Sequence, residues 1–242
     1  MIGERAVVPV YLKTPDGDVP GDPLYYVVAA NGTFLVRNTA LFTATIPATD
    51  VVGLERQQEG ITIHFPPIPR LILEHVIGFF RTVYDRWDGE AIAFLYYAPE
   101  LKEFRVEIPP QTLPRYRSRG RWRTEGRLEY GCLPRPDGFL KLGDMHSHGD
   151  APAFFSGTDD RDDREDGLRI VIGRLDRTRI EMRASFVVNR LRFPVGLSDV
   201  IETPSGPFAL VAPPDDWMRQ VVCRYEASYL ATDCSRGDAD DD

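Results

Sequence analysis

The chain has 242 residues, of which 43% are hydrophobic and 27% are charged, as in a soluble globular protein with a sizeable core. Its net charge of −8 makes nucleic acid an unlikely partner, and it lacks the run of about 18 apolar residues that spans a membrane. Three cysteines show no CxxC spacing (Cys132, Cys223 and Cys234), and the first residues do not resemble a secretory signal. We therefore expect a cytoplasmic protein.

Residues 1–66 are expected to form short strands separated by turns. The apolar segments 25–30 and 32–36 flank Asn31-Gly32, which predicts a hairpin, and residues 60–65 are expected to form a further strand. Helical spacing of apolar residues then predicts an amphipathic helix over 70–87, after Pro69 and before Asp88-Gly89. A buried strand at 90–97 and its hairpin partner at 103–108 should follow.

The second half of the chain begins with an arginine-rich segment, 110–138, that we expect to be irregular. A strand is predicted at 138–148, and the serine, threonine and acids that begin at Ser156 are typical of a helix start. Further strands are expected at 168–175, 180–188 and 190–195. A helix is predicted within 214–229, and the acidic stretch 233–242 is expected to be disordered.

Two of the four histidines, His146 and His148, stand one residue apart on a predicted strand. Side chains at i and i+2 point to the same face of a strand, so both imidazoles can bind one metal ion while Ser147 faces away. Asp159, in the first turn of the predicted helix, can turn back toward them, although Asp160 is adjacent. Two histidines and one carboxylate, with one position open, are typical of a catalytic zinc site.

Such a site also needs a general base that is not a ligand, and a hydrogen-bond donor to an oxyanion. Glu90 is the candidate base because it begins a buried strand after the long helix. Ser156 is the candidate donor, although it could simply cap the predicted helix. His64 and His75 are expected to be structural. Four acids are expected to be solvated, although one could accept a hydrogen bond from a ligating histidine: Asp144, Asp150, Asp162 and Asp163.

These residues resemble a known motif. His-x-His, seven residues, then Ser-x-x-Asp resembles the JAMM motif of the JAB or MPN+ metalloproteases, zinc isopeptidases that remove ubiquitin or ubiquitin-like proteins. The family's glutamate enters a buried strand, and here Glu90 does so, with Ala93 where the family often has glycine. Gly149 stands where the family often has proline. The resemblance covers roughly residues 60 to 195.

The resemblance implies an α/β fold of the MPN (cytidine-deaminase-like) kind, a mixed sheet flanked by helices. It implies a metalloprotease domain over 61–200, with the arginine-rich segment 110–138 as an insertion. A β-rich extension at 1–60 would precede this domain. A C-terminal segment with a helix, 201–232, and the acidic tail, 233–242, would follow it.

The resemblance also implies a function. One zinc ion per chain would be held by His146, His148 and Asp159, with Glu90 and Ser156 catalytic. The activity would be hydrolysis of the amide bond after the C-terminus of a bacterial ubiquitin-like modifier, in deconjugation or maturation. The long extensions resemble a bacterial branch that includes the PRTRC system protein A group and JAB proteins of antiphage conjugation operons. Partners there would be E1-like and E2-like proteins.

The arginine-rich segment is the candidate substrate contact, because in the family this region often grips the modifier. The residues concerned are Arg119, Arg121, Trp122 and Arg123; the alternative is a solvated loop. Two other functions stay open. One is a catalytically silent MPN-type scaffold in a ubiquitin-like conjugation complex. The other is a hydrolase of a small amide or of a sulfur-carrier conjugate.

Overall fold

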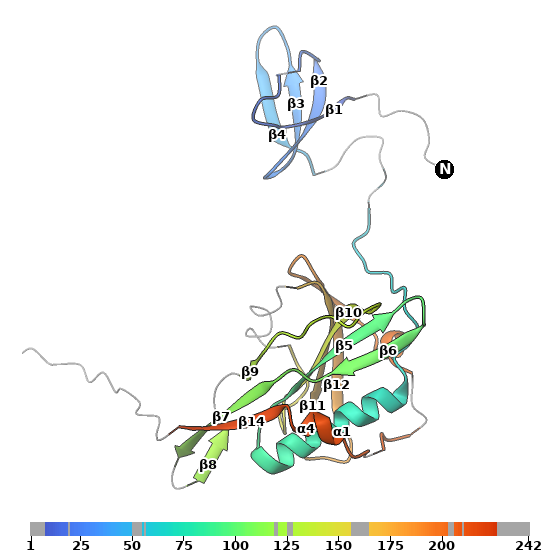
Figure 1. Cartoon of the computed structure of the whole chain (residues 1–242). Helices are drawn as coiled ribbons and strands as arrows, with labels where there is room; N and C mark the ends of the chain where they lie inside the picture. Colours follow the sequence, from blue (N-terminus) through green and yellow to red (C-terminus); the bar gives the residue numbers. More distant parts are fainter. Residues whose placement is uncertain are drawn as a thin grey trace, which may run out of the picture. The chain divides into compact units, whose positions relative to one another are not determined.

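The computed structural model describes residues 8–18, 20–49, 55, 57–118, 121–124, 128–155, 165–202, 206–209 and 211–226. The chain divides into two compact units, Met1–Glu59 and Gly60–Asp242 (Figure 1). Most of the helix predicted to begin at Ser156, and all of the tail predicted at 233–242, lie outside the described residues. Within the described part, no helix is both long and apolar enough to cross a bilayer.

The first unit contains a four-stranded sheet in the order β1-β2-β3-β4, in which β1 and β2 run parallel. The predicted hairpin is confirmed, but its turn lies one residue earlier than expected. Ala29 pairs with Gly32, so Ala30 and Asn31 are the central residues. The strands are β1 (Val10–Leu12), β2 (Leu24–Ala29), β3 (Gly32–Asn38) and β4 (Thr43–Pro47).

A six-stranded sheet forms the body of the second unit, in the order β13-β12-β11-β10-β5-β6. Only the neighbours β10 and β11 run parallel, so the sheet is mixed. Its strands confirm those predicted in these parts of the chain. They are β5 (Ile92–Ala98), β6 (Glu103–Glu107), β10 (Leu140–Ser147), β11 (Gly167–Gly173), β12 (Glu181–Val188) and β13 (Leu191–Val195).

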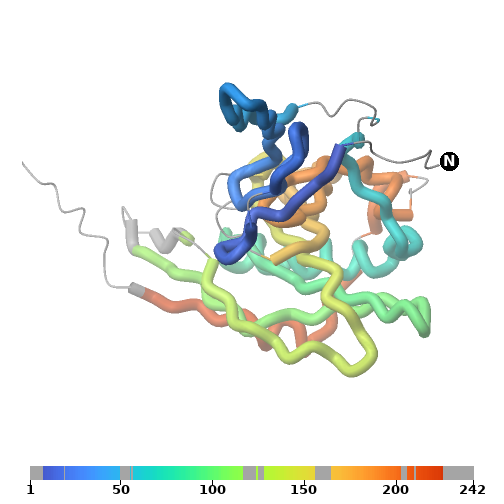
Figure 2. The backbone as a smooth tube through the Cα atoms, turned by 90° about the horizontal axis from the view of Figure 1, so that it is seen from above, coloured from blue at the N-terminus to red at the C-terminus, as the bar shows by residue number. Residues whose placement is uncertain are grey.

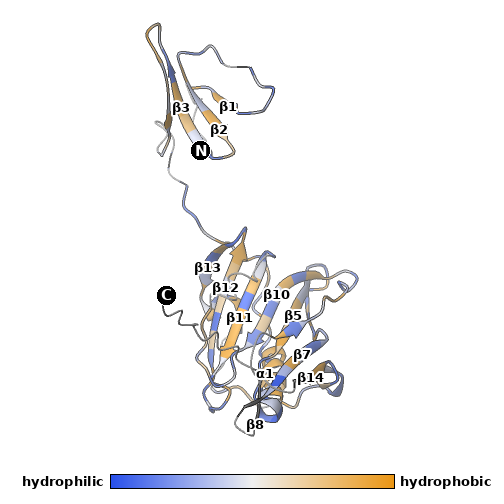
Figure 3. Ribbon diagram, turned by 90° about the vertical axis from the view of Figure 1, so that its left-hand side faces the viewer, coloured by the Kyte–Doolittle hydropathy of each residue, from blue (hydrophilic) through white to orange (hydrophobic). Residues whose placement is uncertain are grey.

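The helix α1 (Arg70–Trp87) packs its apolar side against one face of this sheet (Figure 1). It ends where Asp88 adopts a left-handed conformation with φ of 50° and donates its N–H to the Tyr84 carbonyl. Val76 and Phe80 pack in the same core as Met145 of β10. The central strand β11 is apolar along most of its length (Figure 3), and its side chains are buried on both faces of the sheet. The other described helices, α3 (Leu197–Val200) and α4 (Asp215–Met218), have four residues each.

Residues 60–65 are not a strand, contrary to expectation. The alternation of apolar and polar residues nevertheless appears as alternating burial. Ile61, Ile63 and Phe65 pack against the core, whereas His64 is exposed. Alternating burial needs only an extended chain beside a core, whereas a strand also needs a hydrogen-bonded neighbour.

Two further expectations were wrong, and both concern a second, smaller sheet. Residues 110–138 are not irregular but contribute three strands, and most of the helix predicted within 214–229 is replaced by the short α4 and a strand parallel to β7. Segments far apart in sequence thus lie side by side (Figure 2). Periodicity cannot reveal such long-range pairing. The strands are β7 (Gln111–Ser118), β8 (Arg121–Thr124), β9 (Glu129–Tyr130) and β14 (Val221–Glu226).

Arg115 of this hairpin is buried, contrary to the picture of a solvated basic segment. Arg115 is only 8% exposed, and its guanidinium donates to the Thr124 hydroxyl at 2.8 Å. The Thr124 hydroxyl in turn donates to the carbonyl of Trp87 at the end of α1. This arginine therefore joins the second sheet to the helix instead of serving as a solvated charge.

A β-bulge in β10 sets which side chains face each side of the main sheet. Lys141 pairs with Tyr96 and Asp144 with Phe94, so three steps along β10 match two along β5. A one-residue shift exchanges the two faces of a strand. Beyond the bulge, Gly143 lies so close to β11 that a Cβ there would sit 1.8 Å from the Leu168 carbonyl oxygen.

Replacing Gly143 with Ala should therefore force β10 and β11 apart. We expect a loss of about 3 kcal/mol in the free energy of unfolding, measured by urea denaturation, at the upper end of overpacking costs. Gly60→Ala is the matched control, since a Cβ there meets nothing within 4 Å. Equal stability of the two variants would contradict the close strand approach.

Candidate metal centre

The two histidines lie side by side at the end of β10. The centroids of the His146 and His148 rings are 5.2 Å apart and their planes are inclined by 44°. His148, the first residue beyond the strand, is 8% exposed and donates its backbone N–H to the Ile172 carbonyl at 2.9 Å. The ring of Phe154 packs edge-on against the His148 ring at 4.8 Å. Two imidazoles this close to each other can bind one metal ion.

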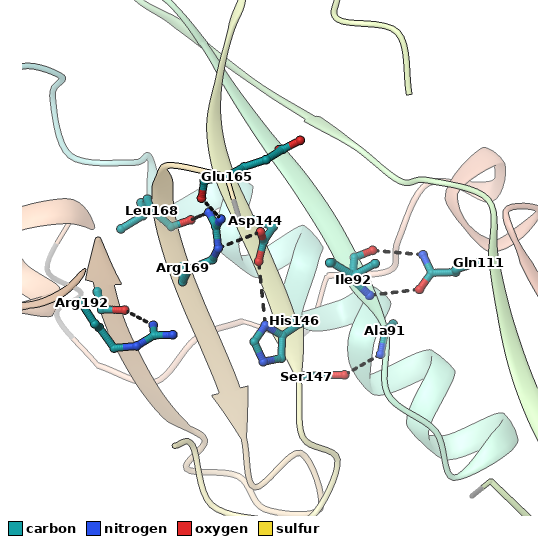
Figure 4. A network of polar contacts seen from close by, with 11 residues as sticks. Ala91, Ile92, Gln111, Asp144, His146, Ser147, Glu165, Leu168, Arg169 and Arg192 are labelled. Atoms are coloured by element: carbon teal, nitrogen blue, oxygen red, sulfur yellow. Dashed lines mark hydrogen bonds and ion pairs between the residues drawn. The ribbon is translucent and has the colours of Figure 1, made fainter. Parts of the chain in front are cut away.

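Asp144 lies on the same strand face, two residues before His146 (Figure 4). Its Oδ1 is 3.9 Å from Nδ1 of His146, and its Oδ2 is 3.3 Å from Nε of Arg169. The Asp144 side chain is only 15% exposed, so the expectation of a solvated acid is wrong for this residue. Its place beside a ring nitrogen matches the alternative left open by the sequence.

The two residues that follow Glu90, Ala91 and Ile92, are held by buried hydrogen bonds (Figure 4). The Ala91 N–H donates to the Ser147 hydroxyl at 2.9 Å, and the Ser147 N–H donates to the Ala91 carbonyl at 3.0 Å. The Gln111 side chain bonds both backbone groups of Ile92 at 3.0 Å, and so continues the sheet where β6 has ended. Buried polar side chains from β10 and β7 thus hold the chain directly after the candidate base.

A cavity of about 280 Å³ adjoins this end of the sheet, and both Glu90 and His148 line it. Its other walls come from the end of α1, the β7–β8 hairpin and the turn after His148. Burial raises the pKa of Tyr84, and the nearby carboxylates of Asp150 and Asp88 raise it further. All three residues line the cavity, so two carboxylates give its wall negative charge. The raised pKa keeps the Tyr84 hydroxyl protonated at physiological pH.

Gly149 adopts a backbone conformation that a proline could not adopt. Its φ of 54° is a left-handed value that a proline ring, fixed near −65°, cannot adopt. The turn it belongs to is tied down, because Gly149 accepts a hydrogen bond from the Leu175 N–H at 2.8 Å and His148 accepts one from Ala151 at 2.9 Å. Glycine here permits a turn that backbone hydrogen bonds hold in place.

The structure brings together three of the predicted site residues, since Glu90 and His148 line one cavity and the His146 ring lies beside that of His148. Ser156 and Asp159 lie outside the described residues, as does Arg119. Arg121, Trp122 and Arg123 belong to β8, but their side chains lie outside the described part. Within that part, no three His, Cys, Asp or Glu side chains are grouped to hold a metal ion.

The two remaining histidines take no part in the centre. His64 is exposed, and Nδ1 of His75 lies 2.8 Å from the Leu71 carbonyl within α1. Sequence reasoning missed Gln111, which bonds Ile92, and Arg169, which pairs with Asp144. Both are buried polar side chains within strands, and nothing in their local sequence indicates what they contact.

Comparison with known proteins gives one family. Residues 86–187 match the family described as prokaryotic homologs of the JAB domain. No curated protein is significantly similar to the chain. Among solved structures, the solution structure of protein DSY2949 from Desulfitobacterium hafniense is 13% identical and covers 65% of this chain and 92% of that chain. The TM-score of this pair is 0.33.

Ser147→Ala should leave the buried Ala91 N–H without its acceptor and cost about 1–3 kcal/mol of stability. We expect amide hydrogen exchange at Ala91, followed by NMR, to accelerate well beyond the change in global stability. Ser185→Ala is the control, because Ser185 is equally buried but accepts from the Arg192 side chain. Unchanged protection of Ala91 in Ser147→Ala would refute the role of this hydroxyl.

Proposed function

The chain belongs to the JAB family through residues 86–187, and on this premise we propose that it is a zinc-dependent peptidase or isopeptidase. It would hydrolyse the amide bond after the C-terminus of a bacterial ubiquitin-like modifier. The observation that carries the proposal is that Glu90 lines the same cavity as His148, whose ring lies beside that of His146. A base beside a two-imidazole set is the arrangement that metal-assisted hydrolysis requires.

The donor set suits zinc. His146 and His148 supply two imidazoles, and we propose Asp159 as the third ligand of one ion per chain. Two nitrogens and one carboxylate favour zinc over the harder cations Mg²⁺ and Ca²⁺. When bound, a zinc ion would supply Lewis acidity, which lowers the pKa of water to about 7 and polarises a carbonyl.

The chain's own residues would move the protons. Glu90 takes a proton from the attacking water, whose oxygen bonds to the carbonyl carbon of the modifier's last residue. Ser156 donates a hydrogen bond to the carbonyl oxygen as negative charge develops there. Glu90 then delivers its proton to the amine nitrogen as the carbon–nitrogen bond breaks. No covalent intermediate with the protein is needed.

We propose an MPN-type arrangement for the domain and a protein substrate for the site. The wall of the cavity formed by Leu113, Pro114 and Thr124 belongs to the β7–β8 hairpin, which supports a role for this hairpin in substrate contact. Arg119, Arg121, Trp122 and Arg123 would then contact the modifier. E1-like and E2-like proteins, in a conjugation pathway such as those of antiphage operons, are the proposed partners.

The direct test uses a ubiquitin-like protein ending in glycine, fused to a fluorescent reporter, with cleavage followed by electrophoresis. Glu90→Gln should lower the cleavage rate by at least about 100-fold, because general acid–base catalysis contributes about 10²–10⁴-fold. Its zinc content should equal that of the wild type, and a chelator should abolish wild-type cleavage. Glu100→Gln, in the exposed turn after β5, is the matched control and should retain full activity.

Full activity in Glu90→Gln would show that Glu90 is not the base. Wild-type protein that binds zinc and the modifier but never cleaves the fusion would instead favour the silent scaffold. Cleavage of small amides without cleavage of the fusion would favour a small-molecule hydrolase.

A further inference from the structure

We infer that Asp144 and Arg169 are a positioning pair for His146. Arg169 fixes the Asp144 carboxylate so that it faces Nδ1 of His146 and leaves Nε2 as the nitrogen that binds the metal. The inference rests on the proposed function for the identity of the metal. The tautomer of the imidazole, however, is a property of this chain that can be measured without any metal.

The pairing of the two central strands brings the three residues together. β10 and β11 run parallel with Asp144 opposite Arg169, and His146 follows two residues along the same face of β10. The carboxylate therefore lies between a guanidinium and an imidazole, with Oδ2 at 3.3 Å from Arg169 Nε and Oδ1 at 3.9 Å from His146 Nδ1 (Figure 4). The side chains of Arg169, Asp144 and His146 are only 6%, 15% and 17% exposed.

Arg169 is held independently of Asp144. Its Nη1 donates to the Leu168 carbonyl at 3.2 Å and its Nη2 donates to the Glu165 carbonyl. The Glu165 side chain accepts from Lys141 Nζ at 2.6 Å. Gly167 leaves space for the guanidinium, because a Cβ there would sit 3.0 Å from Nη1. A guanidinium anchored in this way can present Nε in one fixed direction.

The physical consequence follows from the two oxygens of the carboxylate. Burying a carboxylate is costly unless it is paired, so Arg169 both neutralises Asp144 and takes up one of its oxygens. The other oxygen is then directed at His146. An acceptor at one ring nitrogen favours the tautomer with that nitrogen protonated, and it makes the opposite nitrogen a better metal ligand. Arg169 thus acts on the metal through Asp144 and not by contact.

The test is a double-mutant cycle of Asp144→Leu, Arg169→Met and the combined variant, with zinc affinity measured by competition against a chelator. Arg169→Met alone should weaken zinc binding by about 10–100-fold. In the Asp144→Leu background the same change should alter zinc affinity by less than about twofold, because Arg169 acts on His146 only through the Asp144 carboxylate, which this background lacks. The combined variant replaces both buried charges with apolar groups, a change that folds tolerate well.

Arg115→Met is the matched control for loss of a buried arginine. Arg115 is 8% exposed and bonds Thr124 in the second sheet, so its loss should lower stability but leave zinc affinity within about twofold. Zinc affinity unchanged in Arg169→Met, or lowered equally in both Asp144 backgrounds, would overturn the inference.

A second readout separates this inference from the proposed function. In metal-free protein with neutral histidines, the ¹⁵N NMR spectrum should show His146 mainly protonated at Nδ1, and this preference should be lost in Asp144→Leu. If wild-type protein bound no zinc but showed this pattern, the proposed function would fail and the positioning pair would stand. A wild-type His146 protonated mainly at Nε2 would overturn the pair whatever the zinc content.

Discussion

The register of β10 between its two neighbours is the constraint on which the candidate metal centre depends. On one side, β5 brings the chain that follows Glu90 against Ser147; on the other, parallel β11 brings Arg169 opposite Asp144. The bulge between Lys141 and Gly143 decides that Asp144 and His146 lie on one face of β10, while Met145 and Ser147 point to the opposite face. A one-residue slip would exchange these faces, so the site can form only when the sheet has folded in this register.

Polar side chains at the margin of the sheet bond backbone groups that have no neighbouring strand to pair with. Gln111 serves Ile92 as a neighbouring strand would, and Ser147 does the same for Ala91. Both side chains are almost fully buried, at 2% and 0% exposure, so their hydrogen bonds are costly to lose. The second sheet thereby becomes part of the site's framework, since Gln111 is the first residue of β7 and the same hairpin lines the cavity.

Much of this could be predicted from local patterns. The spacing of apolar residues from Arg70 to Trp87 is helical because one side of α1 lies on the sheet, and the alternation of His146 and His148 gave their common face. The failures share one cause, which is long-range pairing. β14 is a strand because β7 lies beside it, the arginines near Arg115 are in strands because they form a hairpin, and Asp144 is half-buried because Arg169 stands opposite. Such partners lie many residues away and leave no mark in the local sequence.

The central claim is that two imidazoles of this chain bind one catalytic metal ion. The most direct measurement is X-ray absorption at the zinc edge of the purified protein, combined with metal analysis. The account predicts one zinc ion per chain, with two imidazole nitrogens and otherwise oxygen ligands at about 2.0–2.1 Å. A protein without bound zinc, or zinc coordinated by sulfur from the cysteines, would contradict it.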